Sequence, residues 1–303
     1  MKFDFESDLA DELYNGFDNF NVKLPRREKV QEHLLDYLSI SKKLIFPKQR
    51  DVFFNPEFLK RLPAHPKTAV IKHLAHLFKT GKDVNSFQNK RLFQSKFHDH
   101  LVYEWSIYHF HLSIEHEPKS YFRKQVKQLI FALVTDSQVI FLDDDSHARG
   151  TFGDVKWLEI LHDHFPEVIA PYKSNTYVAV YPDFNGMERQ QAWDAGLLLG
   201  TTQVRDAIYH SPGIGRATSG HSVLVTNQVM DIMRWLSQVK SQFTNYYDAI
   251  CRVLNFDSAT AKFNLRFGPQ TFEIAEMESK TTILTCYQLV DESLLNTPTE
   301  GAV

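Results

Sequence analysis

The sequence is poor in the residues and patterns that build several common kinds of site. It has two cysteines, Cys251 and Cys286, in unlike surroundings, which excludes a disulfide framework and a cysteine metal site. Glycine is scarce, at 12 residues, and disfavours a glycine-rich nucleotide loop. No apolar run approaches the roughly 18 residues of a membrane span, and the acidic N-terminus has no export pattern. We therefore expect a cytoplasmic protein with no membrane partner.

The composition is that of a folded protein with a large core. Apolar residues make up 43% of the chain and charged residues 23%, with 24 phenylalanines. A chain of 303 residues exceeds one typical domain, so two domains are expected. We place the first at 1–170 and the second at 171–295, followed by a disordered tail at 296–303.

Helical patterns come first along the chain. Apolar residues recur with a period near 3.6 over 26–45, and again from Val70 to Phe78, which predicts two helices. Between them, Asn55 followed by Pro56 is typical of a helix N-terminus, with Asn55 as the capping residue.

Strand patterns follow. Residues 101–112 are rich in aromatic and β-branched side chains and predict a strand whose alternate residues face opposite ways. Two more apolar strands, 128–134 and 139–142, are joined by a turn at Asp136-Ser137. The predicted fold class is therefore α+β, with N-terminal helices packed on an antiparallel β-meander.

The second domain is also predicted to be α+β. A strand is expected over 177–181, and a long helix over about 222–254. Apolar residues along this helix are spaced alternately by three and four, as in a heptad seam. The seam either packs within its own domain or joins two copies in a homodimer. Its residues are Val229, Ile232, Leu236, Val239, Phe243, Tyr246, Ile250 and Val253.

A basic block, Lys42–Lys96, stands out in a chain with a net charge of only -3. Thirteen Lys and Arg residues face three acids there, a local charge of +10. Such a block favours a polyanionic partner, here RNA or ribosome-associated RNA. The alternative is a solvated helix face.

Histidines cluster beside the predicted meander. Five of the 14 lie between His98 and His116, and His109 and His111 are two residues apart. On one strand, this spacing puts both imidazoles on the same face. Asp143, Asp145 and His147 share a parity on the neighbouring strand, so His109, His111 and Asp143 are an alternative metal site. These residues are otherwise ordinary strand residues, some of them buried.

Residues 213–222 form a glycine-containing segment before the long helix. With Arg216, its backbone N–H groups could hold an anion at the helix N-terminus. The simpler interpretation is that Ser219 or Ser222 caps the helix.

Three short patterns between about residues 50 and 150 resemble the RelE/ParE superfamily of bacterial toxins. They are Glu104-Trp105-Ser106-Ile107-Tyr108, Lys127 followed by Gln128-Leu129-Ile130-Phe131, and Asp143-Asp144-Asp145-Ser146-His147. The resemblance implies two helices followed by an antiparallel sheet, endoribonuclease activity and a protein inhibitor as partner. Gln128 stands where the family has its catalytic arginine, so Lys127 or Arg123 would have to serve.

This family is about a third as long as the present chain, and the second domain has no counterpart in it. The run from Trp105 to Leu112, with its alternating Ile107, His109 and His111, also resembles proteins of bacterial mobile elements.

The favoured hypothesis is a metal-independent endoribonuclease that uses no cofactor. A base removes the 2′-OH proton, an acid protonates the 5′-oxygen, and cations stabilise the phosphate. We assign His109 or His111 as the base and His147 as the acid. The cations would be Arg123, Lys124 and Lys127.

Two other hypotheses stay open at this point. One is a non-catalytic assembly protein that oligomerises through the long helix, and the other is a metal-dependent nuclease with His109, His111 and Asp143. We expect the histidines on an open sheet face. Trp105 and Ile107 share their parity, however, and could make that face a second core.

Overall fold

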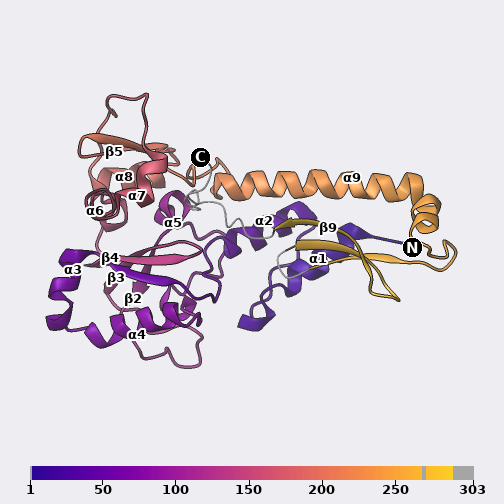
Figure 1. Cartoon of the computed structure of the whole chain (residues 1–303), viewed down its shortest axis with the longest axis horizontal. Coiled ribbons are helices and arrows are strands. Elements are labelled where there is room, and N and C mark those ends of the chain that lie inside the picture. The colour runs from indigo at the N-terminus through magenta and orange to yellow at the C-terminus, as the bar shows by residue number, and fades with distance from the viewer. Residues whose placement is uncertain (1, 268–270, 289–303) are drawn as a thin grey trace, which may run out of the picture. The chain divides into compact units, whose positions relative to one another are not determined.

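The computed structural model describes residues 2–267 and 271–288, with the side chains of 286–288 left out. The α+β class is confirmed (Figure 1). The chain forms two compact units: a terminal unit, Met1–Lys42 with Leu224–Asp291, and a central unit, Lys43–Val223. This division differs from the expected one near Pro171, because the first helices share a core with the last one. The predicted tail, 296–303, lies outside the described residues.

The terminal unit packs helices on a small antiparallel sheet with the order β7-β8-β9. Its longest element, α9, confirms the predicted long helix. The elements are α1 (Phe5–Asn15), η1 (Asp18–Phe20), α2 (Val30–Ser41), α9 (Val223–Val253), β7 (Phe263–Phe267), β8 (Thr271–Glu276) and β9 (Thr282–Gln288).

The apolar seam of α9 is buried inside the terminal unit. Val229, Ile232, Leu236, Val239 and Phe243 are all part of the core that includes residues of α1, α2, β7 and β8. The alternative of a homodimer through these residues is therefore wrong, because their own unit already covers them.

The regular apolar seam of α9 ends before Tyr246, earlier than predicted. Tyr246 has non-helical dihedral angles, and it is 57% exposed. Beyond it, Tyr247 and Cys251 are buried, while Val253 is 83% exposed. The kink at Tyr246 is accompanied by a change in which face of the last turns is buried.

The central unit is built on a mixed four-stranded sheet with the order β1-β4-β3-β2. The predicted meander is confirmed, since β2 pairs antiparallel with β3, and β3 with β4. The sequence did not predict β1, which pairs parallel with β4. The strands are β1 (Asp51–Phe54), β2 (Ile107–His111), β3 (Gln128–Val134) and β4 (Gln138–Ser146).

Both faces of this sheet are covered, and each has its own core (Figure 1). Two helices pack on one face: α3 (Pro56–Arg61), which begins at the predicted cap Asn55, and α4 (Thr68–Lys79). The other face meets α5 (His100–Trp105), α6 (Lys156–His164), α7 (Pro166–Ile169), α8 (Gly186–Asp194) and the hairpin β5 (Thr201–Val204) and β6 (Ala207–His210). Short 3-10 turns are η2 (Leu62–Ala64), η3 (Asn85–Phe87), η4 (Thr151–Gly153) and η5 (Ala170–Tyr172).

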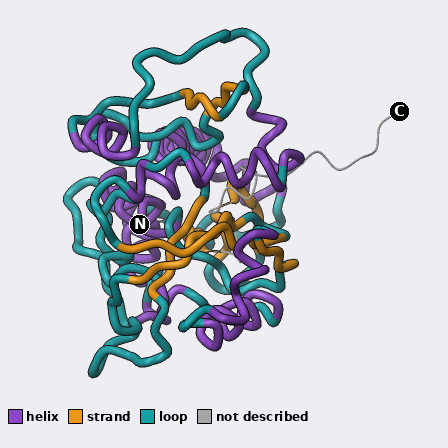
Figure 2. Tube along the Cα trace, turned by 90° about the vertical axis from the view of Figure 1, so that its left-hand side faces the viewer, coloured by secondary structure: helices purple, strands orange, loops and turns teal. Residues whose placement is uncertain are grey.

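Two predicted strands are wrong. Residues 101–112 do not form one strand, because α5 occupies the first part and Ser106, with φ 53°, separates it from β2. Residues 177–181 lie in a long loop with exposed side chains, which Figure 2 draws as part of the loop segments. None of the described helices has the length and apolar character needed to cross a membrane.

Candidate functional site

Three imidazoles meet at one edge of the central sheet. His109 and His111 belong to β2, and His147 follows β4 directly. The ring centroids of His109 and His111 are 6.1 Å apart, and each lies 6.3 Å from that of His147. The prediction that these three rings share a side of the sheet is confirmed. We call them the histidine cluster.

The expectation of an open face is wrong for two of the three rings. His109 is 6% exposed and His111 is 3% exposed. The ring of Phe152, in η4, lies 5.0 Å from both His109 and His147. The same sheet face carries the core that includes α6, so the second-core interpretation holds. His147 is exposed and is where solvent reaches the cluster.

Asp99 orients His109. Its Oδ2 lies 3.3 Å from Nδ1 of His109, and its Oδ1 accepts a hydrogen bond from the Val102 N–H. Burial would raise the pKa of Asp99. Its hydrogen bonds with His109 and the Val102 N–H, and the charge of His109 when that ring is doubly protonated, outweigh burial and hold the pKa below its usual value. The Nε2 atom of His109 is buried and has no hydrogen-bond partner among the described residues.

His111 is fixed in a similar way. Its Nδ1 lies 2.8 Å from the carbonyl oxygen of Val126, to which it donates. Burial lowers the pKa of His111 to about 4, so the ring is neutral at pH 7. Partial burial lowers the pKa of His147, and so does the charge of His109 when that ring is doubly protonated. Within the cluster, His111 is therefore neutral at pH 7, and the exposed ring of His147 takes up a proton less readily than a free imidazole.

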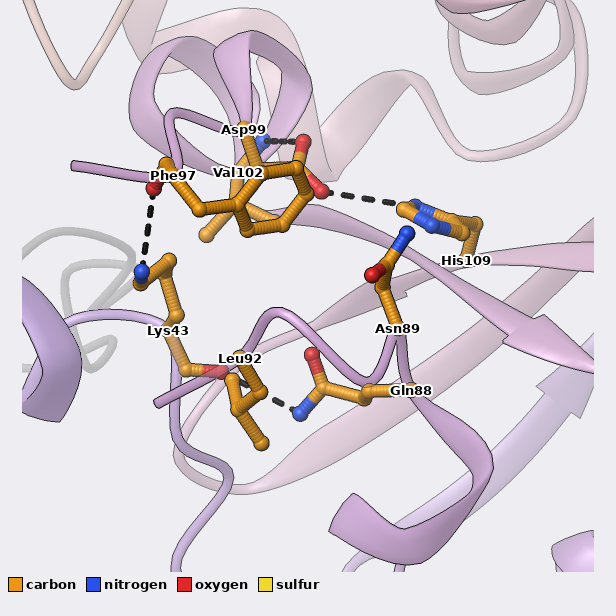
Figure 3. Close-up of a pocket in the computed structure, with 8 residues that line it drawn as sticks. All are labelled: Lys43, Gln88, Asn89, Leu92, Phe97, Asp99, Val102 and His109. Carbon is orange, nitrogen blue, oxygen red and sulfur yellow. Dashed lines mark hydrogen bonds and ion pairs between the residues drawn. The ribbon is translucent and has the colours of Figure 1, made fainter. Parts of the chain in front are cut away.

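A small pocket adjoins Asp99 and His109 at the edge strand β2 (Figure 3). It has room for roughly one water molecule. The amide group of Asn89 points between Asp99 and His109, while Lys43 lies across the hollow. The complete lining is Lys43, Gln88, Asn89, Leu92, Phe97, Asp99, Val102 and His109.

Two of the three predicted cations are engaged elsewhere. Arg123 donates to the carbonyl of Ile114, and its guanidinium lies 4.1 Å from the centroid of the Phe87 ring. Lys124 forms an ion pair with Glu115. Lys127 stays beside the cluster, because its carbonyl accepts a hydrogen bond of 2.8 Å from the His147 N–H. Its own side chain is exposed.

The predicted alternative metal site is not formed. Asp143 is bound by Arg61 of α3, which packs on the opposite face of the sheet from the histidine cluster. Within residues 2–267 and 271–288, no group of three or more His, Cys, Asp or Glu side chains is arranged to hold a metal ion.

The glycine-containing segment packs against α5. The Gly213 N–H donates to the Glu104 carbonyl, and a Cβ on Gly213 would lie 1.6 Å from the Tyr103 carbonyl oxygen. Arg216 donates to the carbonyl of Trp193. Gly213 therefore allows close packing against α5, and Arg216, which an anion site would need, is already hydrogen-bonded to the protein.

The basic block separates into buried, paired and unpaired members. Lys43 is buried, and Lys48 pairs with Asp136. Five exposed lysines of α4 and the segment that follows it have no side-chain partner in the described part of the chain. They are Lys72, Lys79, Lys82, Lys90 and Lys96.

Sequence reasoning missed Asp99 and Phe152. Asp99 carried a usable signal, because an Asp directly before the first helical residue, here His100, is a typical helix cap, and its side chain does cap α5. Phe152 carried none, since its place beside the histidines depends on how the chain returns after β4.

No protein-family model, no curated protein and no solved structure matches this chain.

Proposed function

We propose that the central unit binds RNA and cleaves it without a metal ion, through acid–base chemistry at the histidine cluster. The observation that carries the proposal is the pairing of His109 with Asp99, whose side chain lies 3.3 Å away and is 10% exposed. The Nε2 of His109 has no partner among the described residues, and exposed His147 lies beside it. A base oriented by a carboxylate next to a second imidazole is suited to proton transfer at two oxygens.

His109 is assigned as the base. Because Asp99 accepts from Nδ1–H, the lone pair of Nε2 can take the proton of the ribose 2′-OH. The 2′-oxygen then forms a bond to phosphorus as the bond to the 5′-oxygen breaks. The products are a 2′,3′-cyclic phosphate and a 5′-hydroxyl end.

His147 is assigned as the acid that protonates the leaving 5′-oxygen, and Lys127 as the cation near the phosphate. The lowered pKa of His147 fixes the direction of the pH dependence. Its protonated form declines as the pH rises through that pKa, so the cleavage rate should be higher in mildly acidic solution than above neutrality.

The five exposed lysines supply the RNA-binding surface in this proposal. Lys72 and Lys79 lie on the exposed side of α4, and Lys82 follows it. Lys90 and Lys96 belong to the segment whose Asn89 and Leu92 line the pocket with His109. The basic surface therefore extends toward the edge strand that carries the cluster.

The order of elements also supports the proposal. Helices α3 and α4 precede the antiparallel strands β2, β3 and β4, which is the layout that the toxin resemblance implies. Gln128 donates to Asp144, at 3.1 Å, and so takes no part in the proposed chemistry.

Cleavage by the purified full-length chain, with a chelator present, tests the proposal. His147→Ala should lower the rate by about 10²-fold or more, the usual effect of losing a catalytic acid. His164→Ala is the matched control, because His164 is an exposed histidine of α6, away from the lysines of α4. Full activity in the His147 variant, or loss of wild-type activity with the chelator, would contradict the proposal. Binding without cleavage would reduce it to an RNA-binding role.

RNA binding is tested separately by charge reversal. Replacing Lys72, Lys79 and Lys82 by Glu should weaken binding and flatten its salt dependence, by about 0.7 in logarithmic slope for each lysine that no longer neutralises a phosphate of a single strand. The charge-matched control replaces three exposed lysines of the terminal unit, Lys29, Lys262 and Lys280. Equal weakening in both triple variants would show that the basic surface is not specific.

A further inference from the structure

Lys43 is a buried lysine without a carboxylate in direct contact. Its side chain is 1% exposed, and Nζ donates to the carbonyl oxygens of Gln94, at 2.7 Å, and Phe97, at 3.0 Å. Within the described residues it forms no ion pair. A buried ammonium group is costly unless an opposite charge balances it, so the nearest source of negative charge matters.

That source is Asp99, which lines the same pocket as Lys43 (Figure 3). The third N–H of Lys43 is left over after its two carbonyl bonds. Asn89 also keeps its Nδ2 group available, because its Oδ1 accepts from the Arg91 N–H at 2.9 Å. The pocket that Lys43, Asn89 and Asp99 line together has room for roughly one water molecule, which needs polar partners of this kind.

The pocket thus combines one acid with two groups that can neutralise it, Lys43 and His109. When Lys43 carries its proton, the charge of Asp99 is balanced and His109 needs no second proton. When that charge is missing, Asp99 favours a proton on the imidazole that it contacts at 3.3 Å. A doubly protonated imidazole has no lone pair and cannot act as a base.

We propose that Lys43 is a positioning residue whose ammonium group balances Asp99 and so keeps His109 in the neutral form that accepts a proton. The consequence for RNA cleavage rests on the proposed function, whereas the coupling of the three groups does not. Burial lowers the pKa of Lys43 to about 7, and the charge of Asp99 acts against that shift. Lys43 can therefore lose its proton near neutral pH.

Among the described ionisable groups around Lys43 and His109, Asp99 is the one that carries a negative charge. Burial lowers the pKa of His98, His100 and His111 to about 4, so all three are neutral at pH 7. The groups that act on Lys43, Asp99 and His109 are Arg91, His98, His100, Tyr103, Tyr108, His111 and His147.

The test is nitrogen NMR of the histidine rings in the full chain at about pH 6, below the pKa of Lys43. Wild type should show an unprotonated Nε2 on His109. Lys43→Met should raise the ratio of doubly protonated to neutral His109 on the order of tenfold, the usual effect of a nearby charge. Lys96→Met, which removes an exposed lysine of the same segment, should leave the ratio unchanged.

An unchanged ratio in a folded Lys43→Met protein would overturn the proposal. Should that variant not fold, the wild-type spectrum still decides, because a doubly protonated His109 there contradicts the proposal. Lys43→Arg keeps the charge and should keep the neutral ring. If wild type cleaves RNA, the optimum of Lys43→Met should move to higher pH. If the NMR prediction holds but wild type cleaves no RNA, the proposed function is refuted and the coupling of Lys43, Asp99 and His109 stands.

Discussion

Phe243 provides the sharpest test of how the terminal unit is held together. Its ring centroid lies 5.5 Å from that of Phe3, 5.0 Å from Phe5 and 5.2 Å from Phe263. Phe243→Ala removes this buried ring, and a change of this kind costs about 3–5 kcal/mol. Tyr246→Ala is the matched control, because this aromatic residue of the same helix is 57% exposed, and surface changes usually stay within about 0.5 kcal/mol.

Hydrogen exchange resolved by peptide is the suitable assay, since a two-unit chain need not unfold in one step. In Phe243→Ala, amides of α1 and β7 that open with the terminal unit should exchange about 10²-fold faster or more, because 1.4 kcal/mol is a factor of ten in the opening equilibrium. Amides of β3 serve as the internal reference. Equal exchange in the two variants, or dissociation of a wild-type oligomer by Phe243→Ala, would refute the assignment of the seam to an internal core.

Three further predictions concern the central unit. Gly213→Ala should lower the urea midpoint, because its Cβ would meet the Tyr103 carbonyl at 1.6 Å, whereas Gly200→Ala, with nothing within 4 Å, should not. Asn85→Leu should cost about 2–5 kcal/mol in urea unfolding, because the Asn85 side chain bonds both backbone groups of Ile45, at 2.8 and 2.9 Å, and each buried group left alone costs about 1–3. Acid titration should show stability that is present above pH 6.5 and is lost as the pH falls toward 4. Three histidines with lowered pKa values must then take up protons: His111, which is buried, and His98 and His100, which are partly buried. A flat profile would contradict this.

Local sequence patterns predicted the elements in which buried apolar residues recur at the period of a helix or a strand. The apolar period of α4 and the cap at Asn55 are local signals, and both are confirmed. The β3–β4 hairpin follows from two apolar strands around a short turn. By contrast, β1 has four residues and pairs with a strand more than eighty positions later, so no local pattern identifies it.

The run from residue 101 to 112 shows why composition can mislead. Aromatic and β-branched residues favour strands in general, yet here the first five residues of the run, 101–105, belong to α5, with Asp99 as cap. The change to β2 occurs at Ser106, whose positive φ is not signalled by a glycine. Alternation along the shorter strand was still enough to place His109 and His111 on one side.

Burial of the histidine cluster could not be derived in the same way. Whether a sheet face is open depends on what covers it, and here Phe152 and the core that includes α6 do so. The pairing of Asp99 with His109 joins a helix cap to the middle of a strand. Such a contact follows from tertiary packing, which spacing along the chain does not encode.

The most direct test of the central claim is the chemistry of the RNA ends produced by wild type in the presence of a chelator. Attack by the 2′-oxygen predicts 2′,3′-cyclic phosphate and 5′-hydroxyl ends, and an RNA with a 2′-deoxynucleotide at the cleaved position should stay intact. Fragments with 3′-hydroxyl and 5′-phosphate ends, or cleavage of the deoxy-substituted RNA, would contradict acid–base cleavage by the histidine cluster.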